Sequence, residues 1–199
     1  RQALQRLVRS VIFFKDIVKL DPEQFELLLS VSEFVEAGAG DLVLHKGDSA
    51  TKLYFLLKGQ MAVLSDDDQN LNVISPGEVF GTLSMVTGQE RSATVKAESD
   101  VILLAIDFKY FQAINDYSLF KLDTKLVAYR MVVNNIRWTL EMNKMQDPKH
   151  ALISKLSRLP VFTGERGGKE ELLFLYEQSR LLAELLCEWN ESVLEAAEA

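Results

Sequence analysis

The sequence predicts a mainly β fold with helices, in which short antiparallel strands form a barrel or sandwich. Three observations lead to this fold class: short β-type runs between residues 33 and 107, glycine or turn residues between those runs, and helical spacing on both sides. The candidate strands are 33–37, 41–44, 52–58, 60–65, 71–74, 78–80, 93–98 and 101–105. Many short strands at near-regular spacing favour a barrel or sandwich over a parallel α/β sheet.

Helices are expected before the first strand. Apolar residues between Leu4 and Ile12 fall at helical spacing. A further helix begins at Asp21-Pro22, because aspartate caps helix N-termini and proline suits the first helical position. Inside the β region the helical signal returns only around residues 82–87.

Helical segments are also expected after the last strand, at 108–114, about 118–145, 150–158 and 169 to about 197. Asp147-Pro148 ends the long one, since proline disfavours helix in the residue before it. We therefore divide the chain into N-terminal helices (1–32), a β-roll with a long C-terminal helix (33–146) and a helical extension (147–199).

Composition restricts the classes of function. The net charge of −7 opposes a general nucleic-acid surface, which is normally basic. Cys187 is the only cysteine, so neither a disulfide framework nor a thiolate metal cluster is expected, which fits a reducing cytoplasm. No apolar run is long enough to predict a membrane span. The chain starts at Arg1, so a signal peptide is neither predicted nor excluded.

The most informative stretch is residues 80–97, FGTLSMVTGQERSATVKA. It reads as a strand end, a glycine, one short helix, a glycine turn, an arginine with small neighbours, and a strand. The first N–H groups of a helix are free to bind an anion. Arg91 adds a permanent charge with a planar fork suited to phosphate oxygens, and Ser92 and Ala93 are small enough for close backbone approach. These features predict an anion site, although an arginine between strands is often only a solvated charge.

This stretch resembles the phosphate-binding cassette of cyclic-nucleotide-binding domains, F-G-E-[LI]-[AG]-x-x-x-G-x-x-R-[AS]-A-[TS]. The matching residues are Phe80, Gly81, Leu83, Gly88, Arg91, Ser92, Ala93 and Thr94. Gly47-Asp48, residues 54–59 and residues 76–81 also match the family's glycine pattern, so the resemblance covers about residues 11–145. As a joint pattern it is specific, whereas any one piece is weak.

The resemblance implies an antiparallel eight-stranded β-roll, a jelly-roll-like double-stranded β-helix, that senses cAMP or cGMP and needs no cofactor. It implies that Arg91 pairs with the exocyclic phosphate oxygens. The other ligand-binding residues that it implies are Gly81, Thr82, Leu83, Ser84, Ser92 and Ala93.

Thr82 departs from the family pattern, because a glutamate that accepts the ribose 2′-hydroxyl normally stands there. A hydrogen bond to a charged group contributes roughly 1.5–3 kcal/mol, against about 1 kcal/mol for a neutral pair. Since ~1.4 kcal/mol is a factor of ten, cyclic-nucleotide affinity is expected to fall about ten-fold or more. Three possibilities stay open: a weakened receptor, a different ligand, or an empty pocket on a scaffold that binds no nucleotide.

The long helix carries two apolar stripes. One has the four-three spacing of a coiled-coil seam: Leu122, Leu126, Tyr129, Val133, Ile136 and Leu140. The other contains Phe120, Val127, Met131, Trp138, Met142 and Met145. Two stripes require two apolar partners, which favours a homodimer through the seam. Alternatively, the C-terminal helices of the same chain cover one stripe.

Other functions have less support. A transcription regulator would follow the long helix with a basic helix-turn-helix, but the tail is acidic and reads as one helix, which suits a protein partner or packing on its own domain. His45 and His150 lack metal-ligand spacing, and Cys187 lies in a leucine-rich helix. Asp66–Asp68 reads as a solvated hairpin loop. We expect no catalysis, no metal, no nucleic acid and no membrane partner.

Overall fold

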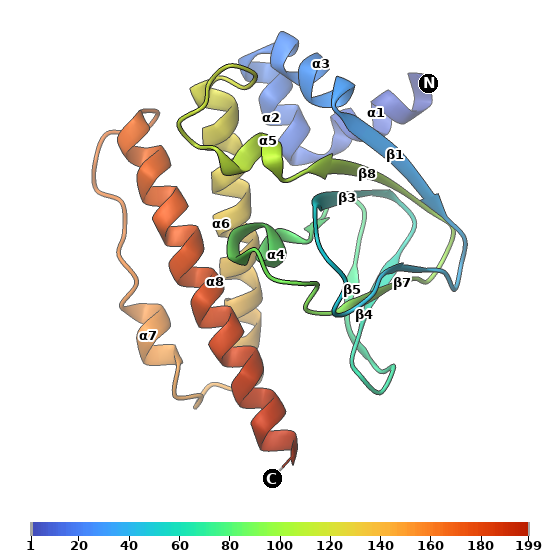
Figure 1. Ribbon diagram of the computed structural model, residues 1–199, viewed down its shortest axis with the longest axis vertical. Coiled ribbons are helices and arrows are strands. Elements are labelled where there is room, and N and C mark those ends of the chain that lie inside the picture. The colour runs from blue at the N-terminus through green and yellow to red at the C-terminus, as the bar shows by residue number, and fades with distance from the viewer. Residues whose placement is uncertain (1, 199) are drawn as a thin grey trace.

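The computed structural model describes residues 2–198 (Figure 1). Three helices come first: α1 (Gln2–Ser10), α2 (Ile12–Leu20) and α3 (Pro22–Ser30). Oδ1 of Asp21 accepts hydrogen bonds from the backbone N–H of Glu23 (3.0 Å) and of Gln24 (3.4 Å). The predicted start of α3 is therefore confirmed, with aspartate as the cap and proline at the first helical position.

The β region consists of antiparallel strands in two sheets. The strands are β1 (Ser32–Ala37), β2 (Leu42–Leu44), β3 (Lys52–Lys58), β4 (Met61–Leu64), β5 (Asn70–Ile74), β6 (Val79–Phe80), β7 (Thr94–Ala97) and β8 (Val101–Asp107). Their order is β1-β8-β3-β6 in one four-stranded sheet and β2-β7-β4-β5 in the other. This arrangement confirms the predicted antiparallel β region flanked by helices.

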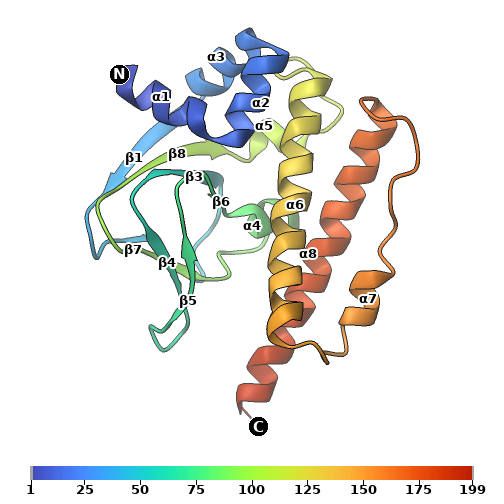
Figure 2. The same ribbon diagram turned by 180° about the vertical axis from the view of Figure 1, so that it is seen from behind.

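The remaining helices lie on one side of the sheets (Figure 2). They are α4 (Thr82–Thr87), α5 (Lys109–Gln112), α6 (Leu122–Gln146), α7 (Ile153–Ser157) and α8 (Lys169–Glu198). Helices α6 and α8 lie side by side and run in the same direction, so the chain between them returns along their length through α7. Within residues 2–198, no helix combines the length and the apolar character that a bilayer crossing requires.

Two apolar cores hold these elements together. The smaller core fills the space between the two sheets and includes Leu56, Met61, Phe80 and Leu103. The larger core joins the N-terminal helices, the outer face of β3 and β8, and helices α4, α6, α7 and α8. Because apolar burial drives folding, the C-terminal extension is part of the same packed unit as the N-terminal helices.

The predicted homodimer seam on α6 is an intramolecular contact in this structure. Leu126, Tyr129, Val133, Ile136 and Leu140 are each at most 4% exposed, and Leu122 is half-buried. The Tyr129 hydroxyl donates to the Phe111 carbonyl (2.9 Å), and the Tyr129 ring lies 5.9 Å from the Tyr176 ring of α8. The chain's own elements therefore cover this stripe, as in the second of the two alternatives, because residues buried within the chain cannot also contact a second copy.

The second stripe of α6 is covered only in its first half. Phe120 is buried and Val127 and Met131 pack against the core, whereas Trp138 is 65% exposed and Met145 is 72% exposed. The exposed half lies in the C-terminal turns of α6, where no described element covers these two side chains.

A buried carboxylate fixes the beginning of α8 to α6. Glu171 accepts two hydrogen bonds from the Arg130 guanidinium, both 2.8 Å long, and a third from the Gly167 N–H (2.6 Å). These donors hold the pKa of the Glu171 carboxyl below its ordinary value, with the Arg130 hydrogen bonds as the largest cause. The two-pronged geometry also fixes the register of α8 along α6.

Candidate anion-binding site

The guanidinium of Arg91 is enclosed by the protein. Arg91 lies in the loop between α4 and β7 and is only 6% exposed. Its Nη2 donates a hydrogen bond to the Lys52 carbonyl at the start of β3 (2.7 Å). Its Cζ lies 5.7 Å from the centre of the Tyr54 ring and 5.6 Å from that of the Phe108 ring, within the range of cation–π attraction.

The other terminal nitrogen of Arg91 has no hydrogen-bond partner among the described residues, although it is buried. The loss of water around the guanidinium lowers the pKa of Arg91 from its ordinary value. No ion pair within residues 2–198 joins Arg91 to an acidic side chain; the nearby group that favours its charge is Tyr54. A buried charge without a counter-charge is costly, and an anionic ligand would supply one.

Gly81 allows the guanidinium to approach the backbone. A Cβ at this position would lie 2.6 Å from Nη1 of Arg91 and 3.1 Å from the Lys52 carbonyl oxygen. Gly81 also has a positive φ of 90°, which glycine adopts without steric cost. Two features therefore require a glycine at position 81: the positive φ of its backbone and the close approach of the Arg91 guanidinium.

Hydrogen bonds of the backbone and of one side chain hold the loop that contains Arg91 against the turn before β3. The Arg91 N–H donates to the Asp48 carbonyl (2.8 Å), and the Gly47 N–H donates to the Arg91 carbonyl (2.9 Å). The Lys46 N–H donates to Oγ1 of Thr94 (3.1 Å). These bonds fix the backbone from which the guanidinium extends, so its position is set by the fold.

Thr82 connects the short helix to α6. Its Oγ1 lies 2.6 Å from Oδ1 of Asn135 and donates a hydrogen bond to it, while Nδ2 of Asn135 donates to the Val79 carbonyl (3.3 Å). Thr82 is buried. The single proton of its hydroxyl is thus already used, which leaves this oxygen only as an acceptor for any ligand.

The other predicted ligand residues are placed less uniformly. The Ser84 side chain is buried and its hydroxyl donates to the Glu90 carbonyl (3.3 Å). Leu83 and Ala93 are half-buried, and Ser92 is exposed. The structure thus gathers Gly81, Thr82 and Arg91 around the start of α4. The Ser84 hydroxyl is instead bonded to the Glu90 carbonyl, and the Ser92 side chain faces solvent.

Three residues around this site were not anticipated: Tyr54 and Phe108, whose rings flank the guanidinium, and Asn135, which bonds to Thr82. A signal existed only for Asn135. It lies between Met131 and Trp138 in the second apolar stripe of α6, where a polar residue predicts a polar partner.

A hollow of about 510 Å³ opens near this site between β1, β2 and β3. Tyr54 lines the hollow and also faces Arg91, so one ring contacts both. Within residues 2–198, no group of three or more His, Cys, Asp or Glu side chains is placed to hold a metal ion.

The fold and the site together define a β-domain in which the loop between α4 and β7 carries a buried guanidinium, and one nitrogen of this group has no partner among the described residues. Residues 34–117 match the model of the family described as cyclic nucleotide-binding domain. Over residues 34–117 the chain therefore resembles a cyclic nucleotide-binding domain.

Curated relatives show the same similarity. The chain is 27% identical over 157 residues to the cAMP-dependent protein kinase type II regulatory subunit of Drosophila melanogaster, covering 78% of this chain and 40% of that protein. It is 34% identical over 98 residues to the cAMP-activated global transcriptional regulator CRP of Pasteurella multocida, covering 47% and 46%. The chain thus spans less than half the length of these two relatives.

Solved structures show the same fold at low identity. A putative cyclic nucleotide-binding protein from Geobacter metallireducens has a TM-score of 0.54 at 20% identity, covering 66% of this chain and 93% of that one. The sensor domain of the transcriptional regulator DNR from Pseudomonas aeruginosa has a TM-score of 0.52 at 21% identity, covering 79% and 99%. The regulatory subunit of a cAMP-independent protein kinase A from Trypanosoma brucei has a TM-score of 0.52 at 17% identity, covering 77% and 49%.

Proposed function

We propose that this chain is a non-catalytic, cytoplasmic regulatory module that binds a cyclic nucleotide, cAMP or cGMP, on an eight-stranded jelly-roll-like β-roll. In this proposal the phosphate pairs with Arg91, and the backbone of Gly81, Leu83, Ser84, Ser92 and Ala93 lines the same site. The observation that carries the proposal is the buried guanidinium of Arg91, whose Nη1 has no partner and which no carboxylate neutralises among the described residues.

Ligand entry requires the guanidinium to exchange partners. Nη1 of Arg91 is enclosed, and Nη2 is held by the Lys52 carbonyl. A phosphate that draws the guanidinium toward itself must therefore weaken the bond to Lys52 and shift the contacts with Tyr54 and Phe108. Phe108 directly precedes α5, so this exchange is a route by which binding moves a helix.

A second route to the helices runs through Thr82. Its hydrogen bond to Asn135 joins the cassette to the middle of α6. The hydrogen bond between Thr82 and Asn135 is therefore a route by which a ligand at the cassette would displace the middle of α6.

A scaffold that binds no nucleotide is the second candidate. It is favoured by Thr82, which replaces the family's glutamate and whose hydroxyl proton is already given to Asn135. In a scaffold, the hydrogen bond between Thr82 and Asn135 would hold the cassette against α6 without a ligand. The exposed leucines and valine of α8, Leu173, Leu181, Val193 and Leu194, would then serve a protein partner.

Calorimetric titration with cAMP and with cGMP tests the two candidates. The receptor function predicts saturable heat that Arg91→Ala removes, because the permanent charge for the phosphate is lost. Arg137→Ala, on α6, is the matched control and is expected to bind as the wild type does. Thermal denaturation of each variant checks that it is folded.

A variant of Thr82, where the family has a glutamate, gives a second part of this test. Thr82→Glu is expected to bind a cyclic nucleotide about ten-fold or more tightly, because a charged acceptor returns for the ribose hydroxyl. No heat at millimolar nucleotide for either the wild type or Thr82→Glu would contradict the receptor function and leave the scaffold.

A homodimer remains part of the proposal only through surfaces other than the seam. The exposed half of the second α6 stripe, Trp138, Met142 and Met145, offers such a surface. Since exposed apolar stripes on helices favour association, we place the dimer contact there if the full protein is a dimer.

A further inference from the structure

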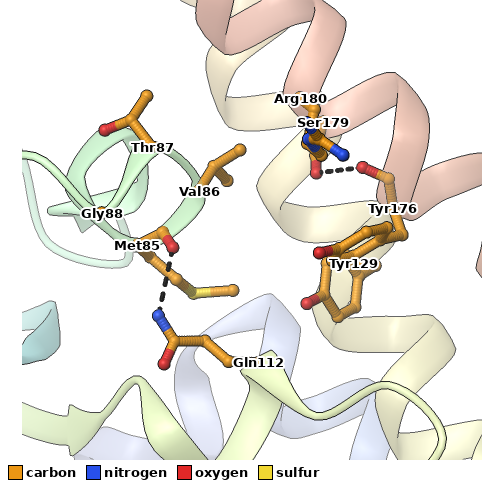
Figure 3. Close-up of a pocket in the computed structure, with 9 residues that line it drawn as sticks. All are labelled: Met85, Val86, Thr87, Gly88, Gln112, Tyr129, Tyr176, Ser179 and Arg180. Atoms are coloured by element: carbon orange, nitrogen blue, oxygen red, sulfur yellow. Dashed lines mark hydrogen bonds between the residues drawn. The ribbon is translucent and has the colours of Figure 1, made fainter.

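A pocket separate from the buried arginine lies between the cassette helix and the C-terminal helix (Figure 3). Its volume is about 300 Å³, and its walls come from α4, α5, α6 and α8. Neither Arg91 nor Thr82 lines it. The pocket exists only because α8 packs beside α4 and α6.

Two opposite walls of the pocket suit a flat apolar ring. Figure 3 shows Met85 and Val86 on one side, facing the rings of Tyr129 and Tyr176 on the other. The two tyrosine rings are 5.9 Å apart and inclined at 60°. A further ring can pack edge-on or offset against them, and a methionine sulfur contacts aromatic rings favourably.

The polar groups of the pocket suit an anion. Arg180 is its cationic side chain, and the ion pair that it makes is a long contact of 3.7 Å with the exposed Glu177. Such an exposed pair is weak and leaves guanidinium donors for a carboxylate. Among the described residues the Tyr176 hydroxyl has no hydrogen-bond partner, and Gln112 uses its Nε2 on the Met85 carbonyl (3.3 Å) while Oε1 stays available.

We propose that this pocket binds a small aromatic carboxylate, with its single ring between Met85 and the two tyrosines and its carboxylate on Arg180. The volume of about 300 Å³ is at the lower end of the range for small-molecule sites, which favours one ring over a larger ligand. The ligand contacts α4 and α8 together, so it stabilises the packing of the C-terminal helix on the cassette. This site is independent of the proposed nucleotide site.

Methyl NMR of the full chain tests the pocket with phenylacetate as the probe and the Met85 methyl group as the reporter. Met145, which is exposed at the far end of α6, serves as the control within the same molecule. Phenylacetate is expected to shift the Met85 signal saturably and to leave Met145 unchanged. Phenylacetamide, which has the same shape without the charge, is expected to bind about ten-fold more weakly, as one charged pair accounts for about that factor.

Variants separate this site from its alternatives. Arg180→Gln is expected to weaken phenylacetate about ten-fold and to leave phenylacetamide unchanged, whereas Arg137→Gln changes neither. Val86→Phe, which fills the pocket, is expected to abolish the Met85 shift, and the rest of its spectrum reports whether it is folded.

Three results would overturn the proposal. One is the lack of a saturable Met85 shift up to the solubility of phenylacetate. Another is an equal loss of phenylacetate and phenylacetamide binding in Arg180→Gln. The third is the loss of phenylacetate binding in Arg91→Ala, which would place the probe at the buried arginine instead of the pocket.

Discussion

At the scale of single residues, the site depends on how closely a guanidinium approaches one glycine. The Cβ position of Gly81 is 2.6 Å from Nη1 of Arg91, whereas a Cβ on Gly47 would meet nothing within 4 Å. Both glycines have a positive φ, 90° and 86°. Alanine variants of Gly81 and Gly47 therefore separate the destabilisation caused by a positive φ from the destabilisation caused by crowding.

Gly81→Ala is expected to lower the free energy of unfolding by about 2–3 kcal/mol, because the methyl group must displace the arginine and the backbone is strained. Gly47→Ala carries only the strain of a positive φ, about 1–2 kcal/mol. Urea unfolding monitored by circular dichroism measures both. Equal losses in the two variants would contradict the crowding at Gly81.

Arg91→Met is expected to leave the free energy of unfolding within about 1 kcal/mol of the wild type, or to raise it, in the absence of ligand. Removing a buried charge that lacks a counter-charge offsets the loss of its hydrogen bond to Lys52. The same urea experiment measures this change. A loss of several kcal/mol would mean that Arg91 is a structural residue and not one kept for an anion.

Residue-scale features differ in how far the sequence predicts them. The motif predicts that Gly81, Thr82 and Arg91 lie close together, because they are close in sequence, and the structure places them around the start of α4; their binding of a ligand stays a prediction. It does not predict that Thr82 bonds to Asn135 on α6, since that contact depends on how α6 packs. For the same reason it cannot predict that Tyr54 and Phe108 enclose the guanidinium.

At the scale of elements, the sequence predicts where helices and strands begin and end better than it predicts how they pack against one another. Capping by Asp21 and the glycine breaks predict the helix start and the strand boundaries to within a few residues. The segments 108–114 and 150–158 contain shorter helices than expected, α5 and α7. Short helices gain little from their own hydrogen bonds, so packing decides where they end.

The attachment of α8 to α6 is expected to weaken in acid. The pKa of Glu171 is lowered in the folded state, so its stabilisation is fully present above its ordinary value of 4.5 and is lost as the pH falls through the folded value. Glu171→Gln is expected to cost about 1–2 kcal/mol at neutral pH and to show less additional loss in acid.

Urea unfolding from about pH 6 to about pH 3 measures the contribution of Glu171, as the difference between the wild type and the variant. Glu170→Gln, at the exposed neighbouring position, is the matched control. The same pH dependence in Glu171→Gln as in the wild type would show that this carboxylate does not contribute.

At the scale of the whole molecule, the seam of α6 shows what periodicity leaves undetermined. The spacing of Leu126, Tyr129 and Val133 predicts an apolar face that must be covered, and the structure confirms that it is covered. Periodicity is the same whether the covering helix belongs to a second copy or to the same chain. Only the packing of α8 distinguishes the two.

Tyr129→Glu is expected to destabilise the folded chain by about 3 kcal/mol or more, because it places a charge in the core and removes the hydrogen bond to Phe111. Trp138→Glu, on the exposed stripe, is expected to cost less than about 1 kcal/mol. Thermal unfolding measures the first effect. Light scattering of Trp138→Glu reports whether the exposed stripe carries a dimer, and a dimer of unchanged strength would exclude it.

The parallel course of α6 and α8 determines how the tail would yield to a pull. Both helices end at the same end of the molecule, and the carboxylate anchor at Glu171 lies at the opposite end (Figure 1). A load applied to the end of α8 across its axis would peel the helix progressively, from Trp189 toward Leu172, with the Arg130–Glu171 pair opening last. A sideways pull on the C-terminal end of α8 would therefore break its contacts in several steps and not in a single rupture.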